Sequence, residues 1–104
     1  MANSIIKEKF AEKMAENLMV LRTKLRFKQS ELAEKVGLSR QTLLEIEKGK
    51  RTMQWNTFLS LLSVFREDSS TNGLLEHFEI YTPELGRYLV SPINEDNEAL
   101  SDGK

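Results

Sequence analysis

The chain has 104 residues, of which 39% are apolar; it has no cysteine, one histidine and a net charge of −1. This length favours a single domain with a small hydrophobic core. The absence of cysteine excludes a disulfide scaffold, a thiolate zinc site and a cysteine nucleophile. One histidine is too few for a histidine metal site or a Ser-His-Asp triad. We therefore expect no cofactor, no metal and no enzymatic activity.

The charge is divided unevenly along the chain. Residues 1–66 contain 13 Lys and Arg against 7 Asp and Glu, a net +6, and residues 67–104 contain 2 against 9, a net −7. A basic front and an acidic rear favour a polyanion-binding front, although small proteins also show such differences by chance. The chain has no long apolar run and begins with polar and charged residues, so we expect a cytoplasmic protein without a signal peptide or membrane contact.

The first predicted element is one amphipathic helix over residues 4–25. Its apolar side chains recur at steps of three or four, as expected for a helix with one buried face; they are Ile6, Phe10, Met14, Leu18, Leu21 and Leu25. This helix is long for a small domain. Its first two turns either project toward a partner or cover the core.

Two short helices around a glycine follow, over residues 28–36 and 39–48. Gly37 permits the left-handed backbone that commonly ends a helix, and Ser39 is a favourable N-cap for the next one. The predicted core-facing positions are Leu32, Ala33, Val36, Leu43 and Ile46. Two short helices joined by a tight turn are typical of a helix-turn-helix, whose second helix enters the major groove of DNA.

The rest of the chain predicts further helices and no strands. A fourth helix spans about 53–65, a polar loop covers 67–73, and a fifth helix covers 72–80. Thr82-Pro83-Glu84 begins a short last helix with a cap, an early proline and an acid near the helix dipole. We expect an all-α bundle of about five helices plus a short C-terminal helix, divided into a DNA-binding domain (1–66), a helical extension (67–92) and a disordered acidic tail (93–104).

Several stretches together match one known pattern: Leu21-Arg22, Gln29-Ser30-Glu31-Leu32-Ala33, Gly37-Leu38-Ser39-Arg40-Gln41-Thr42, Ile46-Glu47-Lys48-Gly49-Lys50-Arg51 and Thr57-Phe58-Leu59. In these residues, about 18–65, the chain resembles the Xre/Cro family, the lambda-repressor-like helix-turn-helix domains of phage and bacterial repressors. The resemblance implies a compact bundle of four or five helices and a DNA-binding transcriptional regulator.

Four residues of the second helix of this motif are candidates for base contacts. Arg40 and Gln41 lie at its start, where recognition helices touch base edges, and can bind guanine and adenine through two hydrogen bonds each. The resemblance also directs positions 44 and 45 to the groove. Leu44 packs either on a thymine methyl or against a neighbouring helix or dimer partner. Glu45 either accepts a hydrogen bond from cytosine or remains a solvated charge.

Seven residues are candidates for phosphate contacts: Lys28, Gln29, Ser39, Thr42, Lys48, Lys50 and Arg51. Such contacts set affinity and salt dependence rather than sequence preference. The resemblance marks Gln29 as a hallmark position that contacts a phosphate and braces the recognition helix. For each lysine, a plain solvated charge is an equal alternative.

The resemblance also assigns a structural pair. In the family, an arginine of the first helix pairs with the glutamate before the glycine that ends the third helix, and Arg22 and Glu47 occupy these positions. We expect a partly buried, bidentate ion pair that fixes the recognition helix.

Together these observations predict a sequence-specific transcriptional regulator of bacterial or phage type. We expect a repressor that binds a palindromic operator on double-stranded DNA as a homodimer, through the recognition helix 39–48. The dimer forms either through the segment after the fourth helix or through the start of the first helix. The alternative is an antitoxin or adaptor whose segment 67–92 binds a protein partner.

Overall fold

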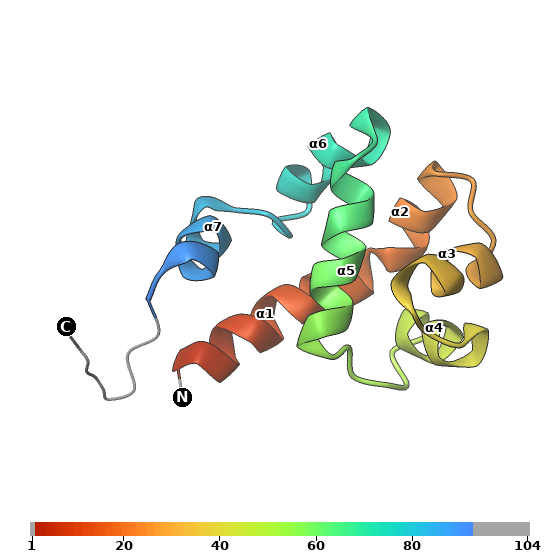
Figure 1. The fold of residues 1–104 in the computed structure, drawn as a ribbon, viewed down its shortest axis with the longest axis horizontal. Coiled ribbons are helices and arrows are strands. Elements are labelled where there is room, and N and C mark those ends of the chain that lie inside the picture. Colours follow the sequence, from red (N-terminus) through yellow and green to blue (C-terminus); the bar gives the residue numbers. More distant parts are fainter. Residues whose placement is uncertain (1, 93–104) are drawn as a thin grey trace.

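The structure is a computed structural model that describes residues 2–92, and these residues form seven helices and no strand (Figure 1). The helices are α1 (Ala2–Glu16), α2 (Leu18–Lys24), α3 (Gln29–Val36), α4 (Arg40–Glu47), α5 (Trp55–Arg66), α6 (Ser69–His77) and α7 (Pro83–Val90). The predicted all-α fold is confirmed. The predicted disordered tail, 93–104, lies outside the described residues.

The prediction of one continuous helix over 4–25 is wrong, because the helix is broken at Asn17. The backbone of Asn17 has φ −112° and ψ 10°, and its N–H donates to the carbonyl of Met14 rather than to that of Lys13. The side-chain amide of Asn17 donates to the Lys13 carbonyl instead, at 2.9 Å. The side chain thus replaces the lost backbone bond. The break lets α1 pack on α4 and α5 while α2 packs on α6.

One hydrophobic core joins all seven helices, and α5 runs through its centre (Figure 1). Its largest fully buried side chains are Phe10, Phe58, Phe65, Met14, Leu18, Leu21, Leu32, Leu43, Ile46, Leu61, Leu75 and Ile80. Leu85 of α7 is also fully buried in this core. The segment after α5 is therefore packed on the same core as the helix-turn-helix.

Several helices end in a turn with a left-handed residue. Gly37 has φ 76° and Gly49 has φ 75°, where glycine carries no steric cost. Arg26, with φ 61°, and Glu79, with φ 62°, adopt the same backbone with a side chain present. In all four turns the next N–H bonds the carbonyl five residues earlier, the bond of a Schellman motif, for example Leu38 N to Ala33 O at 2.8 Å.

The sixth helix begins earlier than the sequence predicted. The expected loop 67–73 and helix 72–80 are replaced by a helix over Ser69–His77. Asp68 caps it by accepting from the N–H of Ser70 at 2.8 Å. Thr71 is fully buried, and its hydroxyl donates to the carbonyl of Phe65 at 2.6 Å. A polar side chain that looks like a loop residue thereby ties the start of α6 to the end of α5.

The last helix lies beside the start of α1, at the end of the molecule away from α3 and α4 (Figure 1). Thr82 caps it, with its hydroxyl accepting from Leu85 N at 3.3 Å, as the sequence predicted. The ring of Tyr88 stands edge-on to Trp55 at 6.1 Å, and Lys9 of α1 bonds Glu84 at 2.6 Å. None of the helices in residues 2–92 is long and apolar enough to span a membrane.

Candidate nucleic-acid interface

The two helices of the motif, α3 and α4, are joined by a tight turn at Gly37. Ser39 then caps α4, since its hydroxyl oxygen accepts from the backbone N–H of Thr42 at 3.1 Å. The same hydroxyl donates to Thr42 Oγ1 at 2.9 Å. Buried Leu43 and Ile46 fix one face of α4 in the core. The opposite face is therefore directed outward.

Arg40 and Gln41 are both exposed in the first turn of α4, as expected for residues that can reach base edges. Leu44, one turn further along, is half-buried. It is not among the apolar side chains that pack against the core of the described chain. Leu44 therefore has an apolar surface left for a contact from outside.

The candidate phosphate contacts surround this face. Lys28, Lys48, Lys50 and Arg51 are exposed, and Gln29 and Thr42 are half-buried. Lys28 precedes the first turn of α3, and its N–H donates to the carboxylate of Glu31 at 2.7 Å. Lys48, Lys50 and Arg51 lie at the end of α4, so basic side chains are available at both helices.

A buried carboxylate joins three elements behind this face. Glu47, at the end of α4, has a side chain only 1% exposed, and it accepts from Arg22 Nε at 2.6 Å and Nη2 at 3.2 Å. The side-chain amide of Gln29 donates to Glu47 Oε1 at 3.2 Å. Arg22 Nη1 also donates to the carbonyl of Phe27 at 2.9 Å. The structure thus brings Arg22 and Glu47 together, and it adds Gln29 as a third partner that braces α4.

A second cluster on α4 joins Glu45 to two other candidate site residues. Its carboxylate accepts from the amide of Gln41 at 3.1 Å and from Arg51 Nε at 2.8 Å. These hydrogen bonds, first that of Gln41 and then that of Arg51, lower the pKa of Glu45 below its ordinary value. Glu45 therefore already has two hydrogen-bonding partners on the outward side of α4.

A family model described as helix-turn-helix matches residues 18–65, which contain α2, α3, α4 and all of α5 except its last residue. Residues 18–65 are an Xre-type, lambda-repressor-like helix-turn-helix domain. Domains of this family bind DNA and regulate transcription, and the protein is a DNA-binding transcription regulator. No curated protein and no solved structure gives a significant match to the chain.

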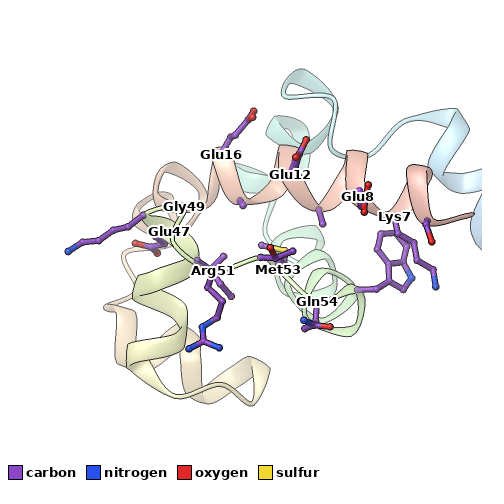
Figure 2. Close-up of a pocket in the computed structure, with 16 residues that line it drawn as sticks. Lys7, Glu8, Glu12, Glu16, Glu47, Gly49, Arg51, Met53 and Gln54 are labelled. Carbon is purple, nitrogen blue, oxygen red and sulfur yellow. The ribbon is translucent and has the colours of Figure 1, made fainter. Parts of the chain in front are cut away.

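A groove of about 870 Å³ lies beside the Xre-type domain, between α1 and the loop from α4 to α5. Figure 2 shows Glu8, Glu12 and Glu16 following one another along α1, with Arg51 pointing away from them. The three carboxylates repel phosphate, so the α1 wall of this groove is unsuited to the DNA backbone, whereas Lys48 and Arg51 lie at its opposite edge next to α4. The basic and polar face of α3 and α4 is the candidate nucleic-acid interface.

Sequence reasoning found the separate residues of the Xre-type interface but missed the cluster at Glu45. The spacing of Gln41 and Glu45, four residues apart on one helix, was a usable signal for a side-chain contact. Arg51 lies beyond the helix end, and no helical spacing relates it to Glu45. After α4 the chain turns back toward Glu45 at Gly49, whose positive φ lets Lys50 N bond the Glu45 carbonyl at 2.8 Å. This turn brings Arg51 within reach of the Glu45 side chain.

Proposed function

We propose that the protein is a repressor that binds a near-palindromic operator as a homodimer, with α4 in the major groove. The observation that carries the proposal is the exposure of Arg40 and Gln41 in the first turn of a helix whose other face is buried. In helix-turn-helix complexes these first positions of the recognition helix contact base edges. Two copies related by a two-fold axis would read two half-sites about one helical turn apart.

The base contacts follow from the chemistry of the exposed side chains. Arg40 donates to guanine O6 and N7, and Gln41 matches adenine N6 and N7. Leu44 packs on a thymine methyl, because its half-buried side chain has no hydrogen-bonding group and lies on the face that meets the groove. A contact of Glu45 with cytosine would compete with the bonds that Glu45 already makes.

The phosphate contacts come from both helices of the motif. Thr42 Oγ1 accepts from Ser39, so its own hydroxyl hydrogen is left for a phosphate oxygen. Gln29 uses one N–H for Glu47 and retains a second. The exposed Lys28, Lys48 and Lys50 add cationic contacts, which supply affinity that falls as salt rises.

For the dimer, the two segments that the sequence left as alternatives lie next to each other, with α7 beside the start of α1 (Figure 1). Lys9 in the middle of α1 bonds Glu84 at the start of α7, and buried Leu85 packs α7 on the core. Three large exposed apolar side chains lie on these helices: Ile5, Leu89 and Val90, which are 65%, 40% and 85% exposed. We define these residues as the α1–α7 face and assign the contact between two copies to it. The extension 67–92 then serves dimerisation while 1–66 contacts DNA.

The same face motivates the second candidate function, an antitoxin or adaptor that holds a protein partner through 67–92. Leu89 and Val90 would then pack on a different protein rather than on a second copy. The two functions separate by experiment, because a homodimer forms from the purified chain alone. A purified chain that is monomeric at all concentrations, both free and on DNA, would favour the partner protein.

Selection of bound sequences from a random DNA pool by the full chain tests the proposed function. The expected result is a two-fold symmetric site whose half-sites are about one helical turn apart. The variant Arg40→Ala with Gln41→Ala should keep its circular dichroism spectrum and lose the selected sequence. A single asymmetric site contradicts the dimer, and no binding even at low salt contradicts DNA recognition.

A further inference from the structure

Both carboxylate oxygens of Glu45 are occupied by neighbours on the face that meets DNA. Oε2 accepts from Gln41 Nε2 at 3.1 Å. Oε1 accepts from Arg51 Nε at 2.8 Å and lies 2.7 Å from Arg51 Nη2. One side chain thereby connects a proposed base-reading residue to a proposed phosphate-binding residue. We call Gln41, Glu45 and Arg51 the Glu45 cluster.

An ionised carboxylate accepts hydrogen bonds and cannot donate them, so Gln41 must turn its NH₂ group toward Glu45. A flipped amide would place the carbonyl oxygen of Gln41 against the negative charge. In the observed orientation, one N–H of Gln41 is used by Glu45, and the other N–H and the carbonyl oxygen remain. One donor and one acceptor are the pair that adenine N7 and N6 require.

Arg51 also reduces the repulsion between the Glu45 carboxylate and the DNA phosphates. A lone carboxylate on the DNA-facing side of α4 would repel phosphates, whereas Glu45 is paired with the guanidinium of Arg51. The hydrogen bonds from Gln41 and Arg51, together with the charges of Arg51 and Lys50, lower the pKa of Glu45. The carboxylate therefore stays ionised, and the acceptor that orients Gln41 persists at neutral pH.

From this geometry we infer that Glu45 is a positioning residue: it fixes the amide of Gln41 in one orientation and so sets the base preference at the position that Gln41 reads. The inference rests on the proposed function, because it assigns Gln41 to a base. It replaces a direct contact of Glu45 with cytosine. Arg51 has a separate role, since it neutralises Glu45 and supplies charge near the backbone.

The cluster can be tested first without DNA, by following side-chain amide resonances of the full chain by NMR. As the pH falls through the range in which carboxylates titrate, the amide of Gln41 should shift with the midpoint of Glu45, and Glu45→Gln should remove this shift. Gln54, an exposed residue that makes no side-chain bond to the helix it precedes, is the internal control. A Gln41 amide that responds no more than that of Gln54 overturns the inference.

The effect on recognition is tested on the selected operator, with the base pair read by Gln41 identified from Gln41→Ala. In Glu45→Gln, discrimination at that pair should fall by about tenfold, in the range of one bidentate base contact. Glu45→Gln combined with Gln41→Ala should not lower discrimination at this base pair below that of Gln41→Ala alone. Arg51→Gln should lower affinity and reduce the salt slope by about one while keeping the base preference.

A matched control removes the same charge elsewhere on the motif. Glu34 is exposed on α3, and Glu34→Gln should leave discrimination at the Gln41 pair unchanged. Full discrimination in Glu45→Gln overturns the inference, and so does an equal loss in the Gln41→Ala background. A wild-type chain that selects no sequence overturns the base-reading role and the proposed function together. If the amide resonance of Gln41 does not shift with pH while the wild-type chain still selects a DNA sequence, the inference alone is overturned.

Discussion

The guanidinium of Arg22 makes two hydrogen bonds, 2.6 and 3.2 Å long, to the carboxylate of Glu47 across 25 residues of sequence. The side chains are only 12% and 1% exposed. The pair joins α2 to the last residue of α4, and Gln29 adds a bond from the first residue of α3. One buried carboxylate therefore ties the end of the recognition helix to α2 and α3, in addition to the core packing of Leu43 and Ile46.

Breaking this pair should destabilise the protein strongly. We expect Glu47→Leu to lower the free energy of unfolding by about 3–5 kcal/mol, because it leaves a mostly buried guanidinium without its counter-charge. Urea denaturation followed by circular dichroism measures the change.

Two further variants test the reason for this loss. Arg22→Met combined with Glu47→Leu should recover most of the stability, since an apolar pair leaves no buried charge. Lys9→Ala, which removes the exposed partner of Glu84, should cost less than about 1 kcal/mol. An equal effect of Glu47→Leu and Lys9→Ala would show that burial does not govern the energy of the Arg22–Glu47 pair.

Val90→Glu should weaken the homodimer without unfolding the monomer. Val90 is 85% exposed on the α1–α7 face, so a carboxylate there costs nothing in the monomer core but places like charges together across a two-fold axis. Sedimentation equilibrium measures the association. Val20→Glu on α2 is the matched control, because Val20 is an exposed valine (48%) outside this face. Dissociation by Val20→Glu alone would move the interface to α2.

Glu79→Gly should stabilise the protein. Glu79 has φ 62°, a backbone region in which a side chain is disfavoured and glycine is not. Relief of this strain should raise the free energy of unfolding by roughly 0.5–1 kcal/mol. Glu79→Ala is the control, since it removes the exposed contact with Lys13, at 3.7 Å, and keeps a Cβ at the strained position. Equal stability of the Gly and Ala variants would show that backbone strain is absent.

The cap of α6 should make stability depend on pH in the acid range. Hydrogen bonds from the hydroxyl and the backbone N–H of Ser70 lower the pKa of Asp68 below 3.8, its ordinary value. A carboxyl whose pKa is lower in the folded state stabilises the fold above the unfolded pKa and loses this effect as the pH falls through the folded pKa. Asp68→Asn should thus be less stable than the wild type at neutral pH, and the difference should shrink below pH 3.8. A difference independent of pH would exclude the charge of Asp68 as its source.

Local chemistry explains why much of the fold could be predicted from the sequence. The glycine turn at Gly37, the caps at Ser39 and Thr82 and the apolar spacing of Leu43 and Ile46 depend on residues a few positions apart. Such interactions involve only neighbouring residues, so the residue types that make them can be recognised in a short stretch of sequence.

The predicted helix boundaries were wrong where a side chain allowed a backbone conformation or burial that its residue type does not normally indicate. Glu79 adopts the left-handed backbone that a sequence suggests mainly at glycine, and α6 therefore ends at His77 rather than at residue 80. Asn17 interrupts a helix whose apolar spacing continues through it, because its amide can replace a backbone donor. Thr71 reads as a loop residue but is buried against the carbonyl of Phe65.

By itself, the sequence determined the helical composition, the position of the recognition helix and the outward direction of Arg40 and Gln41. These follow from helical periodicity and from caps, which act within a few residues. Only the tertiary structure decided that Arg51 returns to Glu45, that Gln29 shares Glu47 with Arg22, and that α7 lies beside the start of α1. These contacts join residues of different elements, and their formation depends on how the helices pack around the core rather than on any local spacing.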